Sequence, residues 1–165
     1  MKKLAAIILT ALALSGCGIY SFTGTSIQPD IKSITIDFFE YRAARVNPSL
    51  ANDLTEGIKN QFRRLTKLEQ LDMDGDLEIS GAITGYDVVA SAITANEVAA
   101  LNKLTVTVKV TFTNRKYPED DLEQNFSAYS EYNSMESLES VEQTLCAEIV
   151  DKLIEDIFNA TVAQW

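Results

Sequence analysis

The side chains that could do chemistry in this chain are few. The 165-residue sequence contains two cysteines, Cys17 and Cys146, and no histidine. Without histidine the chain lacks the usual general base, the Ser-His and Cys-His nucleophile pairs and most catalytic zinc sites. The signature spacings Gly-x-Gly-x-x-Gly, Gly-x-x-x-x-Gly-Lys, Gly-x-Ser-x-Gly and Cys-x-x-Cys do not occur in the sequence either. The sequence therefore predicts a protein that is not an enzyme and that needs no cofactor and no metal.

Cys17 ends a segment with the design of a secretory signal. Two lysines precede an apolar run, residues 4–14, which is too short to span a membrane. The small pair Ser15-Gly16 then stands directly before the cysteine, as in a bacterial lipobox, where the thiol is acylated and becomes the new N-terminus after cleavage. We therefore expect a lipoprotein signal peptide over residues 1–16 and lipidation at Cys17.

The charge of the chain agrees with an anchor made of lipid. The sequence has 14 Lys+Arg against 24 Asp+Glu, which opposes binding to nucleic acid. Loss of two lysines with the signal peptide leaves 12 basic residues and a net charge of −12. An anionic leaflet repels such a chain, so the acyl chains must hold it. No aspartate follows Cys17, and by the usual lipoprotein sorting rule this favours the outer membrane, with the domain on its periplasmic face.

Cys146 is the only other cysteine, so the mature chain can form no disulfide within itself. It falls in an apolar helical row with Val150, Ile154 and Phe158, and free cysteines are among the most buried residues. We expect it to pack in the core. The alternatives are a thiol that pairs with a partner or a thiol that acts as a nucleophile.

Segment 72–76, Asp-x-Asp-Gly-Asp, is similar to the start of a calcium loop, but its spacing fails. With Gly75 at position six of the loop, position twelve is Gly81 and not glutamate, and with Asp72 at position one it is Ile83. We therefore interpret the segment as a turn that leads into a strand.

Hydrophobic periodicity predicts six elements in the order strand, helix, strand, strand, strand, helix. Asn47 caps the first helix, with Pro48 at its first position. The last helix has two possible start points, because the sequence offers two capping boxes, Asn133 with Glu136 and Ser140 with Gln143. The expected strands cover residues 34–38, 77–84, 104–112 and about 122–132. The apolar stripes of the two helices run over residues 50–65 and 138–158. Ile34, Ile36 and Phe38 are expected on the apolar side of the first strand, and Leu50, Leu54, Ile58, Phe62 and Leu65 on that of the first helix.

The connections predict an α+β two-layer sandwich, an about four-stranded mixed sheet with two helices on one face. The last three strands form an antiparallel meander, and the helical crossover sets the first strand parallel to the second or fourth. Gly81 and Gly85 indicate a bulge or a close crossing by a helix. We expect a single domain over residues 31–165 behind a lipidated tether, residues 17–30. Its uncovered sheet face carries Thr105, Thr107, Lys109 and Thr111, and it is either simply wet or a docking surface.

With the lipobox, the aromatic tether and this order of elements, the sequence resembles the LPS-assembly lipoprotein family of LptE type. The resemblance extends over essentially the whole mature chain and depends on the pattern as a whole. The segments that carry it are residues 17–24, the strand 31–39, the helix end 57–62, the segment 76–86, the strand 104–112 and the closing helix through Ile157-Phe158-Asn159.

The resemblance implies an outer-membrane lipoprotein that sits inside, and helps to assemble, the β-barrel translocon delivering lipopolysaccharide to the outer leaflet. The implied partners are that barrel protein and lipopolysaccharide itself. Docking would use the Thr-rich face together with Tyr20 and Phe22 of the tether. Family members contact the glycolipid through basic residues between the second and third strands and near the start of the last helix, and here only Lys103 lies close.

Two other classes of function remain open. Strand-helix-strand modules of this kind also resemble curli-export and Tol-type accessory domains, so the chain could serve another envelope-assembly system. A small-molecule hydrolase with converging carboxylates is the least favoured, because the acidic residues are scattered and few aromatic residues are present to form a sugar platform.

Overall fold

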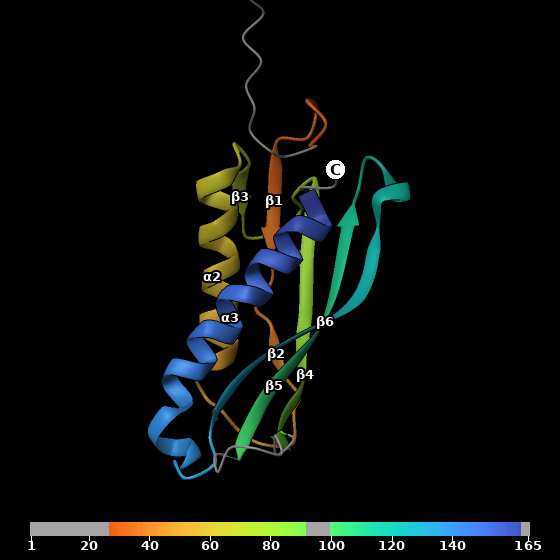
Figure 1. Ribbon diagram of the computed structural model, residues 1–165. Coiled ribbons are helices and arrows are strands. Elements are labelled where there is room, and N and C mark those ends of the chain that lie inside the picture. Colours follow the sequence, from red (N-terminus) through yellow and green to blue (C-terminus); the bar gives the residue numbers. More distant parts are fainter. Residues whose placement is uncertain (1–26, 92–99, 163–165) are drawn as a thin grey trace, which may run out of the picture.

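The computed structural model describes residues 27–91 and 100–162, and it has two layers (Figure 1). One layer is a mixed sheet and the other consists of two helices that lie on the same side of it. The elements are β1 (Ser33–Ile36), β2 (Glu40–Tyr41), α2 (Leu50–Leu65), β3 (Glu69–Leu71), β4 (Leu77–Ser91), β5 (Leu101–Asn114), the 3-10 helix η1 (Pro118–Asp120), β6 (Leu122–Asn133) and α3 (Leu138–Val162).

The strand order is β3-β1-β4-β5-β6, with β2 pairing to β4 beyond the end of β1. Strand β1 runs parallel to β4, with Ile34 opposite Leu77, and β4, β5 and β6 form the predicted antiparallel meander. The predicted α+β class is confirmed, but the sheet has six strands and not about four. The two strands that sequence patterning missed, β2 and β3, are two and three residues long, too short to show alternation.

The inward-facing aromatic residue after β1 was predicted wrongly. Phe38 is 61 % exposed, whereas Phe39 is completely buried. Pairing of β1 with β4 stops near Ile36 and resumes at β2, so the alternation of side chains shifts by one residue in between. The amide of Phe39 donates to Oγ1 of Thr55, 3.1 Å away. This bond holds the segment between β1 and β2 against α2.

The two glycines of β4 have different roles. A Cβ added to Gly81 would lie 2.6 Å from the Phe39 ring and 2.4 Å from the carbonyl oxygen of Lys109, so the glycine makes room for the buried ring and not for a helix. The register of β4 against β5 shifts between Ile83 and Gly85, which confirms the predicted bulge.

Asn47 makes the predicted capping bonds, but α2 itself begins at Leu50, with Ser49 at its N-cap, and not at Pro48. Oδ1 of Asn47 accepts hydrogen bonds from the backbone amides of Ser49 and Leu50, at 3.2 and 3.3 Å, so Asn47 caps the first turn. The buried face of the helix includes Leu54 and Phe62. Leu65 was predicted on this face, but it is partly exposed because it is the last residue of the helix.

Helix α3 begins at Leu138, between the two predicted capping boxes. Asn133 accepts the amide of Met135 in the turn before the helix, and the hydroxyl of Ser140 donates to the carbonyl of Ser137. The apolar stripe of α3 is wide because the helix packs against both the sheet and α2. The rings of Phe62 and Phe158 meet edge to face at 5.0 Å, which joins the two helices.

Segment 72–76 is the predicted turn into β4. Oδ2 of Asp76 accepts the backbone amides of Lys32 and Ser33, at 2.7 and 3.2 Å, and Nζ of Lys116 lies 3.1 Å from the other carboxylate oxygen. Asp74 has φ of 60°. Within residues 27–91 and 100–162 no group of acidic or thiol side chains is arranged to hold a metal ion. The turn thus ties the start of β1 to the start of β4.

Asp76→Asn tests this tie. The amide from Lys32 and then Lys116 lower the pKa of Asp76 from its ordinary value of 3.8, so the carboxylate stabilises the fold above that pH and the contribution is lost as the pH falls. We expect the substitution to lower the free energy of unfolding at pH 7 by about 1–2 kcal/mol and to weaken its dependence on acid. Denaturant unfolding at pH 7 and pH 3 measures both. Asp72→Asn, an exposed carboxylate of the same turn, should change neither, and equal effects of the two substitutions would contradict the role given to Asp76.

Candidate functional site

The face of the sheet turned away from the helices is the main candidate surface. Along β5 the even-numbered residues from Leu104 to Phe112 are at most 2 % exposed, and α3 packs against this strand. The odd-numbered residues lie on the other face. The structure brings the predicted Thr105, Thr107, Lys109 and Thr111 together in one row there, with the three threonines half-buried and Lys109 exposed.

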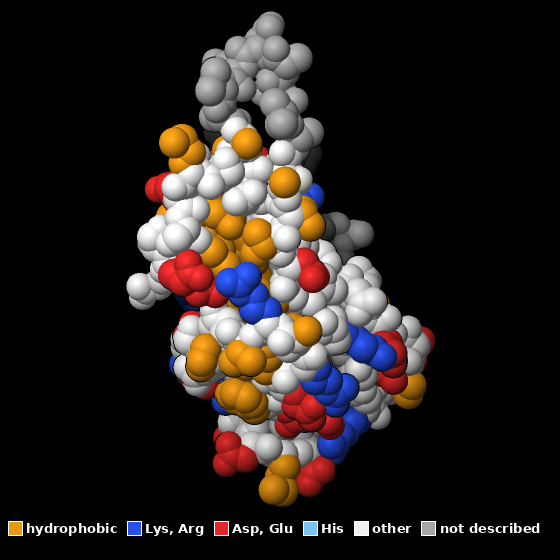
Figure 2. Space-filling view, turned by 90° about the horizontal axis from the view of Figure 1, so that it is seen from below, with side chains coloured by type: hydrophobic (Ala, Val, Ile, Leu, Met, Phe, Trp, Pro, Cys, Tyr) orange, Lys and Arg blue, Asp and Glu red, His pale blue; other side chains and the backbone are white. Residues whose placement is uncertain are grey.

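The polar groups of this face are largely bonded to one another. The hydroxyls of Thr107 and Ser127 lie 2.9 Å apart across β5 and β6, and Lys109 pairs with Glu123. At one end Arg115 binds Asp74 and Glu78, each at 2.9 Å. Seen from below, along the strands, the molecule has acidic and basic side chains lying next to one another, beside apolar ones (Figure 2). Lys109 and Arg115 of this face are thus paired with carboxylates, and Thr107 and Ser127 offer hydroxyl groups. Asp87, which lies opposite Thr105, has no ion pair among residues 27–91 and 100–162.

Two ammonium groups flank one aromatic ring at the edge of this face. Tyr129 of β6 is 54 % exposed, and Nζ of Lys103 lies 5.2 Å from the centre of its ring. Nζ of Lys152, from α3, lies 5.9 Å from the same centre and donates to the carbonyl oxygen of Tyr129 at 3.2 Å. This is cation–π geometry, and it presents positive charge beside an apolar ring.

Of these three residues only Lys103 was predicted from the sequence. Strand alternation could have placed Tyr129 on the open face, since Phe126 and Ala128 point inward. Lys152 carried no local signal, because it reaches Tyr129 only through the fold.

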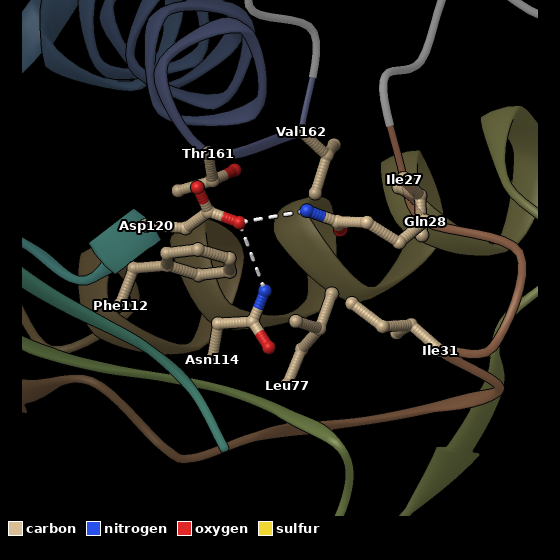
Figure 3. Close-up of a pocket in the computed structure, with 9 residues that line it drawn as sticks. All are labelled: Ile27, Gln28, Ile31, Leu77, Phe112, Asn114, Asp120, Thr161 and Val162. Atoms are coloured by element: carbon tan, nitrogen blue, oxygen red, sulfur yellow. Dashed lines mark hydrogen bonds between the residues drawn. The ribbon is translucent and has the colours of Figure 1, made fainter. Parts of the chain in front are cut away.

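The remaining predicted site residues, Cys17, Tyr20 and Phe22, lie outside the described residues. The described chain begins at Ile27, beside a cavity of about 70 Å³ (Figure 3). There Oδ2 of Asp120 accepts hydrogen bonds from Gln28 at 2.9 Å and from Asn114 at 3.2 Å. The other lining residues are Ile31, Leu77, Phe112, Thr161 and Val162. The segment that follows the predicted tether is thus fastened to η1 and lies beside the last turn of α3.

Cys146 packs in the core, as predicted. Its Sγ lies 3.7 Å from the hydroxyl of Tyr86 and accepts from Nδ2 of Asn47 at 3.6 Å. The Tyr86 hydroxyl also donates to Glu142 of α3. Burial raises the pKa of the Cys146 thiol, and burial together with the bond to Glu142 raises the pKa of Tyr86. Both groups stay protonated at neutral pH, the opposite of what an activated nucleophile requires.

These arrangements have the character of binding surfaces and not of an active site. The open face supplies hydrogen-bonding groups, the Tyr129 edge supplies two amines, and the Cys146 cluster is occupied with internal bonds. No helix in the described ranges is long and apolar enough to cross a membrane.

A family model described as LptE, lipopolysaccharide-assembly, matches residues 31–161. A search of curated proteins gave no match. Several solved structures are similar in fold. A hypothetical protein from Chlamydia trachomatis has a TM-score of 0.50 at 7% identity, over 79% of this chain and 98% of that one. A minor lipoprotein from Acinetobacter baumannii has a TM-score of 0.49 at 12% identity, over 77% and 89%. The uncharacterised lipoprotein B from Nitrosomonas europaea has a TM-score of 0.48 at 10% identity, over 77% and 79%.

The state of the Cys146 thiol can be tested by its reactivity. In a chain carrying Cys17→Ser, so that Cys146 is the only cysteine, we expect a disulfide reagent at pH 8 to react at least about tenfold more slowly than with the chain unfolded in guanidinium. Folding raises the pKa of Cys146 from 9.0, so the thiol ionises more readily in the unfolded chain. The free energy of unfolding therefore keeps its full value below about pH 9 as far as this group is concerned, and it falls as the pH rises above that.

An exposed thiol placed directly before the helix that carries Cys146 provides the control. Ser137→Cys in a chain without Cys17 and Cys146 should react at nearly the unfolded rate whether folded or not. A native Cys146 that reacts as fast as Cys at position 137 would show that the thiol is accessible.

Proposed function

The chain belongs to the LptE lipopolysaccharide-assembly family, and on that premise we propose that it is an outer-membrane lipoprotein that acts as a plug and assembly factor of the β-barrel translocon for lipopolysaccharide. The match of the family model over residues 31–161 is the observation that carries the proposal. Such a protein works by position and shape and turns over no substrate.

The open sheet face supports docking inside a barrel. The interior of a membrane β-barrel is polar, because its apolar side chains face the lipid. A surface that enters it must exchange hydrogen bonds without burying unpaired charge. The hydroxyls of Thr105, Thr107 and Thr111 and the internal pair Lys109–Glu123 meet that condition. We assign the docking surface to this row.

The anchor is assigned to Cys17 and its acyl chains. Nine residues lie between Cys17 and Ile27, so the two are at most about 35 Å apart when the chain is extended. The bonds from Gln28 and Asn114 to Asp120 then hold the start of the domain. In this proposal Tyr20 and Phe22 of the tether contact the domain or its partner, and the domain stays on the periplasmic side.

Lys103 is the proposed contact to lipopolysaccharide. With Lys152 it places two amines beside the exposed ring of Tyr129. Amines bind phosphate groups and an aromatic ring stacks on sugar, so this edge has the chemistry to meet a phosphorylated glycolipid.

Co-isolation from membranes tests the proposed function. Purification of the tagged, lipidated chain from outer membranes in mild detergent should bring down a large β-barrel protein in stoichiometric amount, and depletion of the chain should reduce lipopolysaccharide at the cell surface. Isolation without a barrel would contradict the proposal. Co-isolation of a different complex, with normal surface lipopolysaccharide after depletion, would replace it with a curli-export, Tol-like or other envelope-assembly role.

Thr107→Arg tests the assigned docking surface in the same purification. The substitution adds a long, charged side chain in the middle of the open face, and we expect the co-isolated barrel to fall by about fivefold or more because that side chain blocks close docking and its charge would be desolvated. Asn52→Arg, at an exposed position of α2, is the matched control and should leave the yield of barrel unchanged. Thermal unfolding of both variants checks that each is folded. Equal yields from the two would move the docking surface elsewhere.

A further inference from the structure

A groove of about 820 Å³ runs between α2 and α3, on the helix layer and therefore away from the open sheet face. Its walls come from the loop before α2, the first half of α2 and the first half of α3. Between Glu139 and Ile154 the groove follows α3 for about 22 Å. The acidic residues along it are Asp53, Glu56, Glu139, Glu142 and Asp151.

The groove carries an excess of negative charge. Five carboxylates line it, and in the part of the chain that the structure describes two bases pair with them: Arg45 lies 3.9 Å from Glu139, and Lys59 lies 3.3 Å from Glu56. Glu142 is held by Tyr86 and Asn47. Asp53 and Asp151 have no basic partner within 4.0 Å among residues 27–91 and 100–162. On the open sheet face, by contrast, Lys109 and Arg115 are both paired with carboxylates.

The floor and rim of the groove are partly apolar. Val150 and Ile154 of α3 line it, and Val46 at its rim is 74 % exposed. At Gly57 the two helices approach so closely that an added Cβ would lie 2.3 Å from Cδ1 of Ile154. The groove is therefore narrow at this contact. An occupant must therefore offer both apolar and positively charged groups.

We propose that this groove binds a basic, partly apolar peptide segment of a partner protein. Charge complementarity selects this occupant. A second copy of the chain has the same excess of acid, an anionic lipid head group is repelled, and a metal ion finds no clustered ligands in the described residues. An extended segment of about seven residues, or about four turns of helix, matches the 22 Å length. Lysine or arginine side chains reach Asp53 and Asp151 while apolar ones cover Val46 and Ile154.

The probe is a fluorescent 14-residue peptide of lysine and leucine, with leucine at helical spacing, and its counterpart has glutamate for lysine. The full lipidated chain is titrated in a non-ionic detergent and fluorescence anisotropy is measured. We expect saturable binding of the lysine peptide that weakens as salt is raised, and no binding of the glutamate peptide.

Two double variants of equal charge decide whether the groove is responsible. Asp53→Asn with Asp151→Asn should weaken binding of the lysine peptide by about fivefold or more, the effect of two lost ion pairs. Asp72→Asn with Glu119→Gln removes two exposed carboxylates outside the groove and should change it by less than about twofold. Equal weakening by both pairs, or binding of the glutamate peptide, would overturn the proposal, as would self-association that the groove variants abolish.

None of these measurements involves a barrel. Failure of the groove proposal and failure of the proposed function therefore give different results.

Discussion

Strand β5 has a neighbour on each side along most of its length, and every second side chain on it is withdrawn from water. Burying that apolar row, at about 25 cal/mol for each Å² removed from water, requires a layer above it. Helix α3 packs on the strand and α2 packs beside α3, whereas the hydroxyl-rich row on the other side of the same strand is left uncovered. The fold and its candidate docking surface are thus two consequences of one alternating strand.

The two helices make different contacts with the rest of the fold. Helix α3 packs on β5 and β6 and also against α2, and the contacts Phe62–Phe158 and Gly57–Ile154 hold the pair together at two points. Toward the start of α3 the space between the helices opens into the acidic groove. The cluster of Tyr86, Glu142 and Asn47 at its base satisfies polar groups that α3 would otherwise bury unpaired.

A consistent division of surfaces follows. The open sheet face has hydroxyl groups and the ion pairs of Lys109 and Arg115, which suit a polar and crowded environment. The helix layer carries unpaired carboxylates, which suit a basic partner. The end of the molecule where Gln28 binds Asp120 fastens the start of the domain, so a tether anchored at Cys17 would determine how far these surfaces lie from the membrane.

The sequence by itself determined the class of fold, both helices, the long strands of the meander and the buried position of Cys146, because alternation and helical periodicity are local properties of the chain. It also placed Thr105, Thr107, Lys109 and Thr111 on one face. Only the tertiary structure decided the short edge strands β2 and β3, the exchange of Phe38 for Phe39 in the core, the pairing of Lys152 with Tyr129 and the groove between the helices. Each of these depends on contacts between elements that are distant in the sequence, and such contacts produce no periodic pattern in the sequence itself.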